Sequence, residues 1–319
     1  MLHHSNKNQS GVALITAVLI IAIAVTASVS IASNYQLNFH RTENAFNSGQ
    51  AWAYAKGAEE WAFAILARDQ KDNQANYDAY DESWWNNNEP LVFPLPNGYI
   101  EGKLEDAQSK LNVNTLINQD GTVNTTTVTR FERLFSILEI EPGLVGAIVD
   151  WIDDDDEFTG SLGAEGDIYI GLENAYLPAD RPMVDITELR LVHGFDDEIY
   201  NKLVPHITAL TDLNTVLNIN TASAEILETF DRSAPSGIGP QLVEERNDDP
   251  FRTTNDLNIL LNTSGVINPD LTGVTIGVGT SHFVLNTTCV IGKSQVKMRS
   301  LIYRGGGNNL HVVKRSQNI

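Results

Sequence analysis

A long uncharged apolar run near the N-terminus limits what this chain can fold into more than any other feature does. Residues 12–32 read VALITAVLIIAIAVTASVSIA and contain no charged residue, no proline and no glycine. About 20 apolar residues in a helix, at a rise of roughly 1.5 Å each, span the roughly 30 Å hydrocarbon core of a bilayer. The run therefore predicts either a membrane anchor or the hydrophobic spine of a processed precursor.

The helical pattern continues well past the apolar run. Residues 12–68 contain no proline, and beyond residue 50 small and apolar side chains recur at the i, i+3, i+4 and i+7 spacing of a buried helix face. Residues 69–97 are polar, contain three prolines and predict a surface connection. The pair Trp84 and Trp85 within it indicates either a partner contact or loop packing. Residues 99–106 (YIEGKLED) alternate as a strand does.

An internal repeat organises the middle of the chain. Residues 111–115 read LNVNT and residues 217–221 read LNINT, and each copy is followed by short helix-like runs. The first copy differs from the second by an acidic insertion over residues 153–180. Residues 282–315 are instead rich in β-branched and apolar residues and predict three antiparallel strands. The sequence thus predicts an α+β fold in which an all-α domain is inserted between strands.

Composition and motifs narrow the function classes. The chain has 21 basic and 41 acidic residues, a net charge of -20, which disfavours nucleic acid and anionic membrane surfaces as partners. Its single cysteine excludes an intrachain disulfide. The sequence contains no His-Glu-x-x-His and no Gly-x-Ser-x-Gly motif, so we expect no enzymatic activity.

Residues 221–246 resemble the helix-hairpin-helix of DNA-binding proteins, in which the amides of a Gly-x-Gly turn hold a phosphate. Here the turn is Gly237 to Gly239, and the following residues are acidic rather than basic. We interpret this motif as a fold element without a DNA-binding role.

The acidic insertion begins with six carboxylates within residues 150–157. Oxygen-rich clusters of this kind suit Ca²⁺, which takes six to eight oxygen ligands, although a solvated acidic loop has the same composition. The spacing of Asp153, Asp155 and Glu157 matches the start of an EF-hand loop. However, Phe158 and Ala164 stand where an EF-hand requires its glycine and its bidentate glutamate. The segment is therefore not an EF-hand.

Several of these features together resemble one family. The Gly11–Val12 junction before the apolar run resembles the cleavage site of type IV pilin-like precursors. The LNVNT stretch, residues 149–157 (VDWIDDDDE), residues 163–165 (GAE) and residues 187–191 (TELRL) look like the type II secretion system minor pseudopilin K family. The resemblance covers nearly the whole chain. It implies a pilin-like fold, with the long N-terminal helix packed on an antiparallel sheet and a SAM-like or helix-hairpin-helix-like inserted domain.

The resemblance also implies a function. Members of this family are non-enzymatic tip subunits that help to initiate the pseudopilus and the export of folded periplasmic proteins. The implied partners are the minor pseudopilins I and J, the major pseudopilin, prepilin peptidase and the inner membrane. The chain would be a single-pass inner-membrane protein with its bulk in the periplasm. The alternative interpretation is a minor pilin of a type IV pilus or of a DNA-uptake system.

The resemblance assigns roles to individual residues. Prepilin peptidase would cut after Gly11 and methylate Val12. Most pilin-like subunits carry glutamate at the fifth mature position, where this chain has Thr16. The resemblance also supports a calcium ion in the acidic insertion, with Glu165 and Asp167 as returning ligands. The predicted metal ligands are Asp153, Asp155, Asp156, Glu157, Glu165 and Asp167.

These features predict five segments along the chain. Residues 1–11 form a prepilin leader, and residues 12–33 form the transmembrane or spine helix. Residues 34–110 form the first part of a pilin-like domain. Residues 111–270 form the inserted α-helical domain with its acidic loop, and residues 271–319 complete the pilin-like domain with antiparallel strands.

Overall fold

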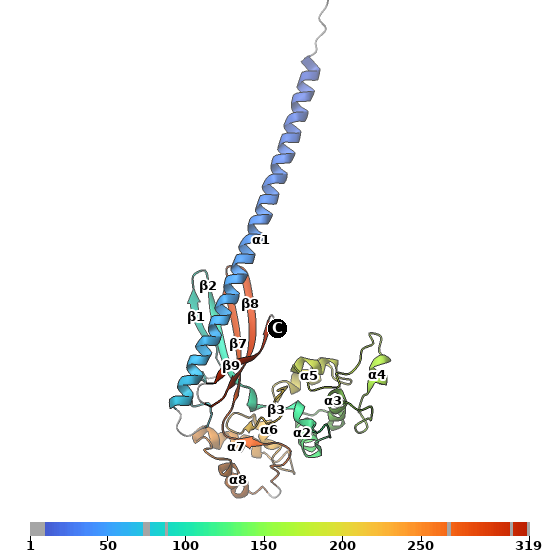
Figure 1. Cartoon of the computed structure of the whole chain (residues 1–319), viewed down its shortest axis with the longest axis vertical. Coiled ribbons are helices and arrows are strands. Elements are labelled where there is room, and N and C mark those ends of the chain that lie inside the picture. The colour runs from blue at the N-terminus through green and yellow to red at the C-terminus, as the bar shows by residue number, and fades with distance from the viewer. Residues whose placement is uncertain (1–9, 73–76, 87–88, 267–268, 307–308, 318–319) are drawn as a thin grey trace, which may run out of the picture.

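The computed structural model describes residues 10–72, 77–86, 89–266, 269–306 and 309–317. A single long helix projects from a small sheet, and a helical domain lies beyond the end of that helix (Figure 1). The predicted α+β class, with a long N-terminal helix, an antiparallel sheet and an inserted helical domain, is confirmed.

Helix α1 extends over Ser10–Asp72. Its apolar first half is exposed to its surroundings along its whole length, while its second half packs on the sheet. The buried face of the second half is lined by small side chains, and these allow the helix to approach the strands closely. That face consists of Ala51, Ala55, Ala58, Ala62 and Leu66.

The sheet has five antiparallel strands in the order β1-β2-β7-β8-β9. Strand β2 (Gly98–Asp106) pairs along its whole length with β7 (His282–Ile291). Segments nearly 200 residues apart in sequence are therefore neighbours in the sheet. The remaining strands are β1 (Leu91–Leu95), β8 (Ser294–Arg304) and β9 (Leu310–Gln317). The three predicted C-terminal strands and the predicted strand over 99–106 are confirmed.

The interpretation of residues 69–97 as a surface connection is wrong in three places. Helix α1 continues as far as Asp72. Residues 91–95 form strand β1 at the edge of the sheet, where Pro94 is tolerated because an edge strand leaves its outer backbone groups unpaired. Trp84 is buried against Phe283, with ring centroids 5.4 Å apart, and Trp85 stacks on Tyr80. The tryptophan pair is therefore loop packing.

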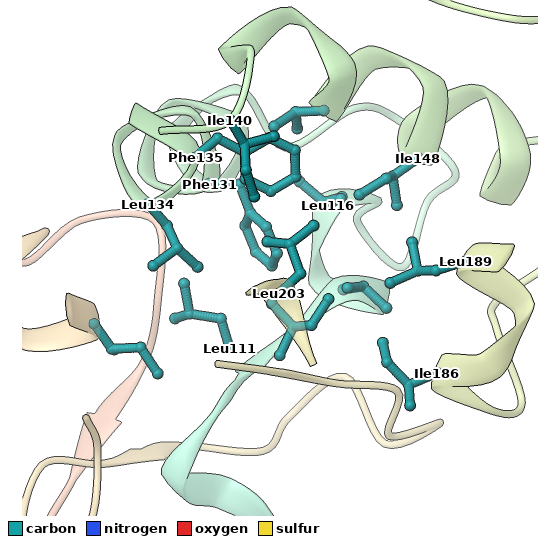
Figure 2. Close-up of a cluster of buried hydrophobic side chains, with 14 of the residues drawn as sticks. Leu111, Leu116, Phe131, Leu134, Phe135, Ile140, Ile148, Ile186, Leu189 and Leu203 are labelled. Carbon is teal, nitrogen blue, oxygen red and sulfur yellow. The ribbon is translucent and has the colours of Figure 1, made fainter. Parts of the chain in front are cut away.

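The helical domain lies between β2 and β7 and has one continuous core. Figure 2 shows Leu116, Phe131, Phe135, Ile148 and Leu203 of this core gathered together. Its helices are α2 (Thr125–Ile137), α3 (Val145–Ile152), α4 (Gly166–Ile170), α5 (Asp197–Leu203), α6 (Ala224–Glu228), α7 (Ile238–Asp248) and α8 (Thr254–Thr263). Short 3-10 helices are η1 (Ala107–Ser109), η2 (Val113–Leu116), η3 (Pro142–Leu144) and η4 (Ile186–Leu191), and two-residue strands are β3 (Leu111–Asn112), β4 (Ile207–Thr208), β5 (Leu217–Asn218) and β6 (Ile276–Gly277).

The predicted internal repeat is confirmed: both copies contain similar short elements, and equivalent asparagines make similar hydrogen bonds. In the first copy, the Asn114 side chain accepts from the Met183 N–H at 2.7 Å and donates to the Leu210 carbonyl at 3.0 Å. In the second copy, the Asn220 side chain accepts from the Phe251 N–H at 2.9 Å and donates to the carbonyl of the same residue at 2.9 Å. The last asparagine of LNxNT thus holds a distant loop in both copies.

A buried polar junction joins the helical domain to the sheet. Asp106, the last residue of β2, accepts from Asn218 at 2.9 Å and from Thr221 at 2.6 Å. The side-chain oxygen of Gln108 accepts from the backbone N–H of Ser281 at 2.6 Å and of His282 at 3.0 Å. These bonds tie the helical domain and the segment before β7 to the end of β2.

Candidate metal centre and membrane helix

Three carboxylates converge where α3 ends and α4 begins. Asp150 lies in the last turn of α3, Asp153 is the residue that ends α3, and Glu165 immediately precedes α4. Carboxylate oxygens from all three lie within 4.8 Å of one another. The chain brings them together by folding the acidic loop of residues 154–164 back over α3. We call these three residues the carboxylate cluster.

The carboxylate cluster is buried and short of partners. Asp150 is 0% exposed, and Asp153 and Glu165 are each 4% exposed. One oxygen of each, namely Asp150 Oδ2, Asp153 Oδ1 and Glu165 Oε1, is buried without a hydrogen-bond donor. A buried charge without a partner is costly, so these three oxygens make the cluster a candidate for holding a cation.

The pKa values of all three carboxyl groups are raised by their burial. Burial, followed by repulsion from the neighbouring aspartates, raises the pKa of Asp153 to about 7. Burial and repulsion from Asp150 and Asp153 raise the pKa of Glu165 to about 7. Burial also raises the pKa of Asp150. A cation would remove the repulsion and favour the ionised form of all three groups.

Glycines make the return of the acidic loop possible. A β-carbon on Gly146 would lie 2.1 Å from the Thr159 carbonyl oxygen, and one on Gly163 would lie 2.4 Å from Asp150 Oδ2. The other oxygen of Asp150 accepts from the Thr159 N–H at 2.9 Å. The loop is thus held against α3, while a side chain at either glycine would push it away.

The structure separates the predicted ligands into two groups. Asp153 and Glu165 lie in the carboxylate cluster, together with Asp150, which the predicted ligand set did not include. Asp150 precedes Asp153 by three residues, so both face the same side at the end of α3. The remaining predicted ligands are exposed and lie outside the cluster: Asp155, Asp156, Glu157 and Asp167.

The apolar half of α1 is the second candidate site. Among the described residues, α1 is the one helix long and apolar enough to cross a membrane. Gly11 and Val12 belong to the first turns of α1, and residues 1–9 of the predicted leader lie outside the described residues. The Thr16 hydroxyl donates within its own helix, with the carbonyl oxygens of Val12 and Ala13 at 3.1 Å and 3.0 Å.

Known proteins share this architecture. Two family profiles described as "Type II secretion system (T2SS), protein K" match residues 109–212 and 217–278. The type II secretion system protein K of Pseudomonas aeruginosa is 31% identical, over 97% of this chain and 93% of that protein. The chain belongs to the type II secretion system protein K family. The predicted family resemblance is thereby confirmed, and membership decides against a type IV pilus or a DNA-uptake system.

Further members of the protein K family support the assignment over the full length. The protein from Pectobacterium carotovorum subsp. carotovorum is 31% identical, over 97% of this chain and 96% of that protein. A chain in the crystal structure of the GspK-GspI-GspJ complex from the enterotoxigenic Escherichia coli type 2 secretion system superposes with a TM-score of 0.74. That chain is 26% identical, and the match covers 88% of this chain and 99% of that one.

A second acidic trio in this protein K family member has a different character. Asp69, Asp78 and Glu82 also bring carboxylate oxygens within 4.8 Å of one another. Arg304, however, donates to Asp69 at 2.8 Å and also pairs with Asp78. The guanidinium already supplies positive charge there, so this trio fits a structural ion-pair network better than a metal site.

The hairpin that resembles a DNA-binding motif has its anion position filled from within the chain. The Glu228 carboxylate accepts from the N–H of Gly237 at 2.8 Å and of Gly239 at 2.6 Å, and also from that of Ser236. Burial alone would raise the pKa of Glu228, but these backbone donors outweigh it and lower the pKa. In this member of the protein K family, the amides that could hold a phosphate hold a carboxylate instead.

Proposed function

We propose that this chain is a non-enzymatic minor pseudopilin that occupies the tip of the type II secretion pseudopilus. At the tip it helps to initiate assembly and the export of folded periplasmic proteins. The observation that carries the proposal is the hydrogen bonding of the Thr16 hydroxyl. Its hydroxyl is satisfied by carbonyls of its own helix, so the spine presents no unpaired polar group at the position where other pilin-like subunits carry glutamate.

The physical argument concerns charge in hydrocarbon. A carboxylate in the membrane or in a fibre core is costly unless it is paired, and in pilin-like fibres the partner is the N-terminal amine of a neighbouring subunit. A subunit at the end of a fibre has no such neighbour above it. Threonine needs none, because it donates to the preceding turn of its own helix.

The partners follow from family membership and from the exposed helix. Minor pseudopilins I and J are proposed partners because the superposed chain belongs to a GspK-GspI-GspJ complex. The exposed apolar side chains of α1, which include Leu19, Ile23 and Phe39, suit an inner-membrane anchor before assembly and a fibre core with the major pseudopilin afterwards. Prepilin peptidase would prepare this spine by cutting after Gly11 and methylating Val12.

The carboxylate cluster is the proposed calcium site. Its metal-binding atoms would be carboxylate oxygens, which suit a hard cation. One oxygen of each of the three carboxylates is buried without a hydrogen-bond partner. Asp150, Asp153 and Glu165 would hold the ion. The exposed Asp155, Asp156, Glu157 and Asp167 stay candidates for the rest of its oxygen shell. A bound ion would supply positive charge between the end of α3 and the start of α4 and would hold these two ends together.

The decisive experiment determines the N-terminus and tests the spine. Mass spectrometry of the chain produced with a prepilin peptidase should give a mature form that begins at N-methylated Val12, and it should co-purify with subunits I and J. Cells that carry Thr16→Val should export periplasmic proteins normally, because this substitution introduces no charge. Cells that carry Thr16→Glu should export several-fold less of these proteins. An uncut leader would overturn the proposed processing, and normal secretion with Thr16→Glu would overturn the proposed tip position.

A further inference from the structure

Helix α4 and the loop that follows it expose large apolar side chains. Ile168 and Leu172 are 37% and 38% exposed, and Ile170 is 58% exposed. Leu177 is 64% exposed and lies beside the start of α4, with its Cδ2 3.8 Å from where a β-carbon of Gly166 would be. We call Ile168, Ile170, Leu172 and Leu177 the α4 cap surface.

The interior side of α4 is already complete. Tyr169 is fully buried between these exposed residues, and its ring lies 5.5 Å from that of Trp151 and 5.3 Å from that of Tyr176. The Tyr169 hydroxyl accepts from the His193 N–H at 3.1 Å. Tyr169 thus anchors the helix from its buried side, and four large exposed apolar side chains in one short segment are a candidate docking surface.

The charge around the α4 cap surface restricts its partner. Residues 153–180 contain nine acidic residues and no lysine, arginine or histidine. Asp167 and Glu173 are exposed and are the sequence neighbours of Ile168 and Leu172. Such a surface repels anionic lipid and nucleic acid, and it repels a second copy of the same acidic segment. It complements a protein surface whose apolar side chains are framed by lysine and arginine.

The position of α4 suits such contact. In the view of Figure 1, α4 lies at the outer edge of the helical domain, away from both α1 and the sheet. Glu165 of the carboxylate cluster directly precedes α4, so a cation there would hold α4 in place.

We infer that the α4 cap surface docks a partner protein whose apolar side chains are framed by lysine and arginine. A cation bound by the carboxylate cluster holds the surface in its docking position, and this part of the inference rests on the proposed calcium site. The cation also keeps part of the segment's negative charge neutralised. The remaining exposed carboxylates then select a basic partner.

The test uses the full chain in nanodiscs of zwitterionic phosphatidylcholine, with empty nanodiscs as background. The probe is a fluorescent amphipathic peptide of leucine and lysine at helical spacing, and the matched peptide carries glutamate in place of lysine. We expect anisotropy to show binding of the lysine peptide only. The double variant Ile170→Ser, Leu177→Ser should weaken that binding at least tenfold.

The matched control is Ile259→Ser, because Ile259 is 54% exposed on α8 and far from the acidic segment in sequence. It should bind the lysine peptide as the parent does. Docking at α4 is overturned if the double variant binds normally, or if Ile259→Ser weakens binding equally. It is also overturned if the chain binds phosphatidylglycerol vesicles better than the lysine peptide.

A separate measurement of cation binding distinguishes the proposed calcium site from the proposed docking surface. Terbium luminescence reports whether the carboxylate cluster binds an ion at all, and EDTA should weaken peptide binding at least threefold. If terbium binds and EDTA has no effect on the peptide, the cation's part in docking is wrong. If terbium does not bind but the double variant still loses the peptide, the calcium proposal fails and the docking surface stands.

Discussion

Replacing Glu165 by glutamine should make the metal-free protein more stable at pH 8 and should abolish its stabilisation by calcium. Glu165 has a pKa of about 7 in the folded chain, against about 4.5 in an unfolded one. The folded state therefore holds a proton that the unfolded state has lost between these values, and its stability falls as the pH rises from about 4.5 to about 7. Above pH 7 the parent carries the full cost of the ionised group.

The size of the effect follows from the same values. A difference of about 2.5 pH units corresponds to about 3.4 kcal/mol at 1.36 kcal/mol per unit. Screening by water around the exposed acidic loop reduces this to about 1 to 2 kcal/mol. Glu165→Gln should gain this amount at pH 8 and almost nothing near pH 4.5. Calcium at about 100 times its dissociation constant should stabilise the parent by about 2.7 kcal/mol.

The assay is thermal unfolding with 1 mM calcium chloride or with EDTA, followed at pH 4.5 and pH 8. Terbium luminescence sensitised by Trp151, which lies in α3 between two members of the cluster, measures cation affinity directly. That affinity should fall about tenfold per pH unit below 7 for each carboxylate that must lose a proton. Glu244→Gln removes one exposed charge from α7 and serves as the control.

The result that would refute this reasoning is equally specific. If calcium and EDTA leave the parent's Tm unchanged, and Glu165→Gln unfolds at the same temperature as the parent at pH 8, then the segment is a solvated acidic loop. If Glu244→Gln gains as much stability as Glu165→Gln, the effect reflects net charge and not the carboxylate cluster.

Three further substitutions test other parts of the fold. Arg130→Met should cost about 3 to 5 kcal/mol in a denaturant titration, because a buried guanidinium that bonds three backbone carbonyls is lost. Glu228→Gln should cost about 1 to 3 kcal/mol above pH 5, since it removes the anion that the Gly239 amide holds, and a mobility-shift assay should still detect no DNA binding. Glu59→Gln should cost about 1 to 2 kcal/mol and speed hydrogen exchange in β9, because Glu59 binds Arg315 at 2.6 Å.

Each of these substitutions has an outcome that would contradict it, and Arg130→Met also has a control variant. Arg133→Met, next to Arg130 on α2 but less buried, should cost less than Arg130→Met, and the reverse order would contradict the assignment. Salt-sensitive DNA binding by Glu228→Gln would show that the hairpin amides remain a phosphate site. Unchanged exchange in β9 after Glu59→Gln would show that strand pairing alone holds the last strand.

The long helix and the C-terminal strands could be predicted because their signals are local. The absence of proline over residues 12–68 and the recurring apolar face define α1, two-residue alternation defines β2, and β-branched and apolar residues define β7. Strand β1 was missed because Pro94 and its polar surroundings resemble a loop. Whether Trp84 contacts a partner or the core depends on Phe283, which is 199 residues away in sequence, and no local pattern carries that information.

By itself, the sequence determined the spine, the repeated asparagines, the excess of acidic residues and the family they resemble. The tertiary structure alone decided which carboxylates meet. Consecutive residues point in different directions once the chain leaves α3 at Asp153, so most of the acidic run faces water, whereas Asp150 and the distant Glu165 are turned inward. Burial then raises the pKa of Glu165 and leaves its oxygen without a donor. The sequence gives the number and order of the charged residues, but only the folded chain determines which of them are removed from water.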